Sequence, residues 1–141
     1  METFVSGMFF DFSNQGAGSG FLVRPDGYIV TNNHVIDGAT QINVHLPDGE
    51  TYKARVVGRD EVSDLAVIKI NVDGMSYGNL AIDNEFSVGD WVVAIGNALA
   101  LKGGPTVTVG IVSGVGRTIN TERGEFYGLI QTDAAINDGN S

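Results

Sequence analysis

The sequence contains no cysteine, so disulfide bonds and thiolate chemistry are both excluded. Basic residues are also scarce: eight lysines and arginines stand against 17 acidic residues, and the formal net charge is −9. Nucleic acids and anionic membrane surfaces both attract basic patches, and this charge balance argues against either as a partner. No apolar run approaches the roughly 20 residues of a membrane helix, and the first residues carry no positive charge that would indicate a signal peptide.

Apolar residues and glycine are abundant. Hydrophobic residues make up 43% of the 141 positions, enough for one compact core, and 20 glycines against three prolines suit tight turns and sharply bent strands. The apolar residues recur mostly with a period of two, and no long segment follows the period of a helix. We therefore expect an all-β chain with strands at residues 18–23, 28–31, 41–46, 51–58, 65–70, 91–95, 106–115 and 126–132.

The segment 137–141 has the sequence Asn-Asp-Gly-Asn-Ser and is a candidate catalytic turn. Glycine tolerates positive φ, so Gly139 lets the backbone fold sharply two positions before Ser141. Such a turn can aim the backbone N–H groups of Gly139 and Ser141 at one point, as an oxyanion hole beside a nucleophile requires. An ordinary surface turn has the same composition. The motif therefore gains weight only from partners elsewhere in the chain.

His34 is the first candidate partner. An apolar, β-branched run is followed by the polar residues Thr-Asn-Asn, and this histidine comes directly after them. Histidine is the most common general base near neutral pH, because its unperturbed pKa is about 6.5. The alternative is a histidine that merely caps a strand end. His45 offers a contrast, because it alternates with apolar neighbours on a polar face and is predicted to be solvated and inert.

Asp64 is the second candidate partner. It stands directly before the apolar run 65–70, which we expect to be a buried strand. An acidic residue at the mouth of such a strand could orient the far nitrogen of an imidazole. The alternative is a turn aspartate that closes the polar segment 59–63.

Three segments resemble the signature blocks of the HtrA (Deg) serine proteases: Thr-Asn-Asn-His-Val-Ile at 31–36, Ser-Asp-Leu-Ala-Val at 63–67, and Gln-Thr-Asp-Ala-Ala-Ile-Asn-Asp-Gly-Asn-Ser at 131–141. The blocks occur in the family's order and at its approximate separations. The resemblance covers nearly all of the chain from Gly18 onward. It implies an all-β, chymotrypsin-like fold of two perpendicular β-barrels, the first complete and the second truncated.

The same resemblance implies a Ser-His-Asp mechanism, in which His34 is the general base, Asp64 orients it and Ser141 is the nucleophile. The oxyanion hole would be built by the backbone around the nucleophile, at Gly139, Asn140 and Ser141. Ile136 would line the primary specificity pocket, which suggests a small or medium apolar residue before the cleaved bond. Mobile loops that control the oxyanion hole in such enzymes correspond here to residues 97–105 and 117–124.

Three regions are expected along the chain. Residues 1–17 would be an N-terminal segment whose aromatic residues either form a homotrimer interface, as HtrA-like proteases commonly do, or fold back over the first barrel. Residues 18–78 would be the first β-barrel. Residues 79–141 would be the second β-barrel, left incomplete because this stretch is long enough for only about four strands.

The expected function is that of a serine endopeptidase acting on unfolded or misfolded proteins, located outside the cytoplasm, with no cofactor and no metal. Two histidines on separate segments and no cysteine disfavour a zinc site. The remainder of the protease domain and a PDZ domain would lie beyond Ser141, and a chain ending at that residue would hydrolyse protein poorly. The alternative is a catalytically incompetent fragment or a peptide-binding, chaperone-like barrel module.

Overall fold

Strands make up most of the regular structure in the described part of the chain, as the sequence predicts. The computed structural model describes residues 8–12, 17–82, 86–96, 105–122 and 124–137, and of residues 8–12 the backbone only. The elements are β1 (Met8–Phe12), β2 (Ala17–Leu22), β3 (Tyr28–Asn32), α1 (Asn33–Ile36), β4 (Ile42–His45), β5 (Thr51–Asp60), β6 (Leu65–Lys69), β7 (Trp91–Gly96), β8 (Thr106–Thr121) and β9 (Gly124–Thr132). The α1 helix has four residues, and no helix in the described part is long and apolar enough to cross a membrane.

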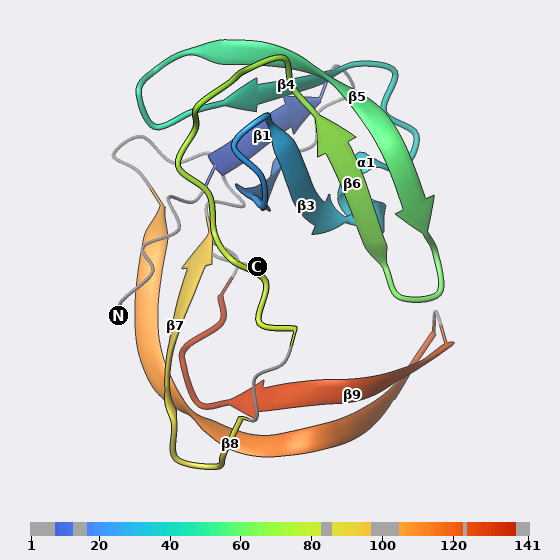
Figure 1. Ribbon diagram of the computed structural model, residues 1–141. Helices are drawn as coiled ribbons and strands as arrows, with labels where there is room; N and C mark the ends of the chain where they lie inside the picture. Colours follow the sequence, from blue (N-terminus) through green and yellow to red (C-terminus); the bar gives the residue numbers. More distant parts are fainter. Residues whose placement is uncertain (1–7, 13–16, 83–85, 97–104, 123, 138–141) are drawn as a thin grey trace.

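The first six strands form a closed barrel in the order β1-β2-β3-β6-β5-β4 (Figure 1, upper part). Every neighbouring pair is antiparallel, and β1 closes the barrel because it pairs with β2 on one side and β4 on the other. Closure leaves no strand edge with unpaired backbone groups. Short connections such as the turn at Pro25-Asp26-Gly27, where Gly27 has φ +94°, link the strands.

The barrel begins earlier than the sequence predicts. Its first strand, β1, lies within the segment 1–17 that we expected to precede the barrel, so the boundary at residue 18 is wrong. Residues 8–12 show no alternation between apolar and polar side chains that would mark a half-buried strand. Their role is visible only in the folded barrel, where they pair with β2 on one side and with β4 on the other. The aromatic side chains of the segment lie outside the described residues, so the expected trimer interface stays a prediction.

The same closure changes the surroundings of His45. In the register of β1 and β4, Phe9 stands opposite His45, and on the other side of β4 His45 stands opposite Thr51. The His45 side chain is half-buried, its Nε2 has no solvent contact, and its Nδ1 lies 2.9 Å from Thr51 Oγ1. The predicted solvated side chain is therefore wrong, because the sequence does not reveal the strand beside it.

The barrel core is made by alternate residues along the strands, which face inward. Ile29 on β3, Val44 on β4 and Ile68 on β6 are all completely buried. The full buried cluster consists of Leu22, Ile29, Ile36, Ile42, Val44, Leu46, Ala66, Ile68 and Ile70. This cluster holds β3 and β6 side by side, and these two strands carry the candidate active-site residues at their ends.

The rest of the described chain forms an open three-stranded sheet in the order β7-β8-β9 (Figure 1, lower part). Its core is small: Val112 and Ala134 are its buried apolar residues, while Trp91 on β7 is 80% exposed. The β8 strand runs on to Thr121 and β9 starts at Gly124, so the predicted loop at 117–124 is mostly a strand hairpin. Of the other predicted loop, only Pro105 is described. The three predicted strands themselves are confirmed.

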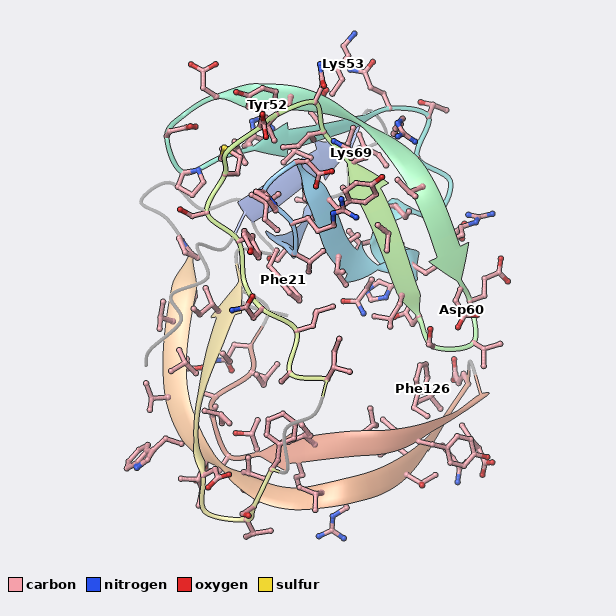
Figure 2. All side chains as sticks on the ribbon, in the orientation of Figure 1. Phe21, Tyr52, Lys53, Asp60, Lys69 and Phe126 are labelled. Atoms are coloured by element: carbon pink, nitrogen blue, oxygen red, sulfur yellow. The ribbon has the colours of Figure 1, made fainter. Side chains whose placement is uncertain are left out.

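The barrel and the open sheet meet along β2 and β7, which are in contact. Phe21 lies on the outer face of β2, next to the core residue Leu22, and Figure 2 shows its side chain directed from the barrel toward the sheet. Gly78 donates its backbone N–H to Leu22 O at 2.8 Å, so the connection between the two regions also lies against β2. The two regions are therefore joined at the side of the barrel nearest β2.

Candidate active site

His34 is presented by a sharp turn at the end of β3. The strand ends at Asn32, and the chain turns immediately into α1, where Ile36 is buried against the barrel core. Gly18 leaves room for Val35, because a Cβ at position 18 would collide with the Val35 side chain. With its two following residues anchored, His34 is turned outward and its side chain is 47% exposed. The sequence placed His34 at a strand end; the structure places it in the first turn of a helix.

Asp64 is brought to His34 by strand pairing. The β3 and β6 strands are antiparallel, and Asn32 stands opposite Leu65, so the residue before β6 lies beside the residues after β3. Asp64 has φ +55°, and it is the one non-glycine residue with positive φ in the described part. An aspartate can adopt this left-handed conformation, at a cost that neighbouring contacts must offset.

The two side chains make a close contact. Asp64 Oδ2 lies 2.5 Å from His34 Nδ1, and Asp64 Oδ1 accepts the His34 backbone N–H at 2.8 Å. An ionised carboxylate can only accept hydrogen bonds, so the proton of the neutral imidazole is on Nδ1 and the lone pair is on Nε2. The Asp64 side chain is only 16% exposed, whereas His34 is open to solvent. This arrangement presents a fixed imidazole whose Nε2 can take a proton.

The turn before Asp64 is stabilised by Asp60. This carboxylate accepts the Ser63 hydroxyl at 2.6 Å and the backbone N–H groups of Val62 and Ser63 at 3.2 Å. The Ser63 hydroxyl, followed by the Val62 N–H, lowers the pKa of Asp60 below its ordinary value. The polar segment 59–63 is thus a turn held by its own aspartate, and Asp64 remains available to His34.

The predicted nucleophile and oxyanion-hole residues, Gly139, Asn140 and Ser141, lie outside the described residues. The chain can be followed toward them as far as Asn137. Ile136, the predicted specificity residue, is 54% exposed. Of the predicted site, the structure therefore brings together His34 and Asp64, and it shows the path of the chain as far as Asn137.

That path is fastened to β8 by three contacts. Asp133 Oδ1 accepts the backbone N–H of Ile111 at 2.7 Å, and Thr108 donates its hydroxyl to Ala135 O at 2.8 Å. Between them, Gly110 lies so close to the Ala134 backbone that a Cβ there would overlap it. The sequence alone assigns no role to these residues. Asp133 lies inside a motif block and Gly110 inside a predicted strand, where an isolated glycine signals a close backbone approach.

Comparison with known proteins extends this picture. A family model described as a trypsin-like peptidase domain matches residues 18–141. A probable periplasmic serine endoprotease, DegP-like, from Chlamydia pneumoniae is 51% identical over 124 residues, which are 88% of this chain and 25% of that protein. A protein of the same description from Hahella chejuensis is 50% identical over 127 residues, covering 90% of this chain and 26% of the relative.

Solved structures agree with the sequence matches. The HtrA-type protease AlgW with a tripeptide superposes with a TM-score of 0.83 at 40% identity, over 96% of this chain and 44% of that chain. The serine endoprotease from Yersinia pestis gives a TM-score of 0.79 at 37% identity, over 96% of this chain and 47% of that one. The chain thus spans about a quarter of the length of the curated relatives and less than half of the matched structures.

Proposed function

We propose that this chain, which belongs to the trypsin-like peptidase family and within it to the HtrA group, carries the catalytic residues of a serine endopeptidase. The observation that carries the proposal is the contact of Asp64 with both the ring and the backbone N–H of His34. An imidazole with its tautomer fixed in this way is the general base that an acyl-transfer mechanism needs. The resemblance to the HtrA group supports the Ser141 hydroxyl as the group from which this base would take a proton.

In the proposed mechanism, Ser141 Oγ attacks a peptide carbonyl while His34 Nε2 takes its proton. His34 then returns the proton to the leaving amine, and water completes the hydrolysis of the acyl-enzyme by the reverse sequence. Asp64 holds the imidazole and stabilises its charged form. The backbone N–H groups of Gly139 and Ser141, with the intervening Asn140 peptide, would bind the oxyanion.

We further propose that the substrates are unfolded or misfolded polypeptides and that the site of action lies outside the cytoplasm. The description of several relatives as probable periplasmic serine endoproteases supports the location. The choice of substrates follows from the resemblance to the HtrA group alone. Ile136, exposed on the segment leading to Ser141, is proposed to line the primary specificity pocket. The homotrimer, the remainder of the protease domain and a PDZ domain stay proposals drawn from the HtrA group.

The test is active-site labelling. A fluorophosphonate probe would be applied to the 141-residue chain and to the same chain continued past Ser141 with the corresponding segment of a DegP-like relative. We expect labelling of the extended chain at Ser141, its loss in Ser141→Ala and His34→Ala, and a fall of about 10⁴-fold in casein hydrolysis for Asp64→Asn. Labelling that is equal in wild type and His34→Ala would contradict the proposed base.

The alternative is a peptide-binding module without catalysis. One observation favours it: β7 and β9 are edge strands of the described sheet, and Trp91, Val93 and Tyr127 on them are exposed. Exposed edges with apolar side chains can add a peptide as a further strand. Binding of unfolded casein by Ser141→Ala, together with no labelling of the extended wild type, would favour this function over the enzyme.

A further inference from the structure

We propose that Asn32 is a positioning residue for the His34–Asp64 pair. Its side-chain amide would hold the Asp64 peptide in the left-handed conformation that directs the Asp64 carboxylate to the imidazole. Only the effect of this residue on catalysis rests on the proposed function, because the contacts themselves are independent of any reaction. It gives a role to a residue of the 31–36 motif that the Ser-His-Asp scheme does not use.

The Asp64 backbone needs support. With φ +55° it occupies a region that residues with a side chain rarely adopt, and such a conformation persists only where the surroundings enforce it. Two donors converge on its carbonyl oxygen: the Asn33 backbone N–H at 2.9 Å and the Asn32 side-chain Nδ2 at 3.1 Å. Together they fix the direction of the peptide that leads from Asp64 into β6.

The carboxylate completes this arrangement. Asp64 Oδ1 accepts the His34 backbone N–H, and Oδ2 contacts the His34 ring. Asp64 therefore accepts four hydrogen bonds from three consecutive residues, two at its carbonyl and two at its carboxylate. The carbonyl and carboxylate contacts share one Cα, so a backbone shift that draws the Asp64 carbonyl away from Asn32 also moves Oδ2 relative to Nδ1.

The position of Asn32 explains why an asparagine is suited to it. Asn32 is the N-cap of α1, where asparagine normally accepts a backbone N–H of the first turn, yet its side chain makes no such bond. One of the two N–H groups that an N-cap side chain can bind, that of His34, is already taken by Asp64 Oδ1. The Asn32 side chain serves as a donor instead. Aspartate would cap the helix equally well but cannot donate.

This difference separates a positioning role from a capping role. If Asn32 were only a cap, Asn32→Asp should be neutral or slightly stabilising, because a negative charge at a helix N-terminus is favourable. If Asn32 positions Asp64, the same variant removes the donor and loosens the imidazole. Asn32→Ala removes the donor without adding charge and should also loosen the His34 imidazole. Gln41→Glu is the matched control, since it changes another exposed side-chain amide, which donates to Asn43 Oδ1, into a carboxylate.

The measurement is the proton NMR signal of His34 Nδ1–H, assigned by ¹⁵N labelling and by its loss in His34→Ala, in the 141-residue chain. We expect a resolved downfield signal in wild type and in Gln41→Glu. In Asn32→Asp and Asn32→Ala, exchange of this proton with water should be about tenfold faster, the effect of one lost orienting hydrogen bond. Backbone amide spectra should show that the barrel stays folded. A signal in both Asn32 variants that exchanges as slowly as in wild type would overturn the proposal.

A second readout separates this inference from the proposed function. In the extended chain, Asn32→Ala should lower kcat/KM for a peptide substrate about tenfold, whereas in a His34→Ala background it should change the residual rate little. If the extended wild type fails to hydrolyse or be labelled while its Nδ1–H signal responds to Asn32 as described, the enzyme proposal fails and the positioning of Asp64 stands. If hydrolysis occurs but the Asn32 variants leave both readouts unchanged, the positioning role fails and the enzyme proposal stands.

Discussion

The closed barrel and the open sheet are built from the same kind of alternating sequence, but they bury it very differently. On β6, Ala66 and Ile68 are buried inside the closed wall of strands. On β7 and β8, Val93 and Val109 stand opposite one another in the register, and both are more than half exposed. Alternation thus decides which side chains share a face. Whether that face is covered depends on closure, which is a property of the whole sheet.

Hydrogen exchange along the 141-residue chain should distinguish the barrel from the open sheet most strongly. Central strands with buried neighbours open only through global unfolding, whereas edge strands open locally at much lower free energy. We expect amides of β3 and β6 to exchange on the order of a thousandfold more slowly than amides of β7 and β9. Equal protection in the two regions would mean that the open sheet is as cooperative as the barrel.

A pair of identical substitutions tests the same contrast in free energy. Ile68 is completely buried, and Ile130 on β9 is 45% exposed. Ile68→Ala should lower the free energy of unfolding by roughly 2–5 kcal/mol, through lost burial and the cavity left behind. Ile130→Ala should change it by less than about 0.5 kcal/mol. Urea denaturation followed by circular dichroism measures both, and similar losses would show that the sheet buries Ile130 against another surface in solution.

Two glycines, one in each region, differ in how closely the neighbouring backbone approaches them. Gly110→Ala would force β8 away from Ala134 and break the Asp133–Ile111 hydrogen bond, at a cost of about 1–3 kcal/mol. Gly58 on β5 has nothing within 4 Å of an added Cβ, so Gly58→Ala should be neutral or stabilise by up to about 1 kcal/mol. Unfolding curves give the two values, and exchange of the Ile111 amide should accelerate only in the first variant.

Asp60 in the barrel and Tyr127 in the sheet should make small contributions to stability that change in opposite directions with pH. The folded pKa of Asp60 lies below its ordinary value of 3.8, because Ser63 and Val62 donate to its charged form. Its contribution to stability is therefore present above that value and lost as the pH falls through the folded pKa. In the sheet, a hydrogen bond with Glu125 raises the pKa of Tyr127 above 10.0, so that contribution is present below pH 10 and lost as the pH rises through the folded pKa.

Thermal unfolding across pH checks both signs. The difference in Tm between wild type and Asp60→Asn should vanish in acid, and the difference for Tyr127→Phe should vanish in alkali. Both groups are exposed, so the shifts should be small and should shrink further in salt. A wild-type advantage over Asp60→Asn that grows in acid would contradict the assigned cause.

The His34–Asp64 part of the candidate site could be predicted because its chemistry is local to short motifs. The segments 31–36 and 63–67 indicated a general base and an acidic partner, and the structure puts His34 and Asp64 in contact. Asn32 and Asp133 stood in the same motifs without a role, since their contacts join residues that only the fold brings together. Gly110 could be suspected from its place in a predicted strand, but its partner could not be identified.

The amino-acid sequence was sufficient to predict the all-β class, the strands from residue 17 onward and the residues able to do acid–base chemistry, because side-chain period and residue type are local properties. The closing of the barrel by residues 8–12, the half-buried His45 and the left-handed backbone of Asp64 became visible only in the folded chain. Each of these depends on which strands become neighbours. Strand pairing is set by the total burial and hydrogen bonding of the closed sheet, and no single segment of the chain contains that information.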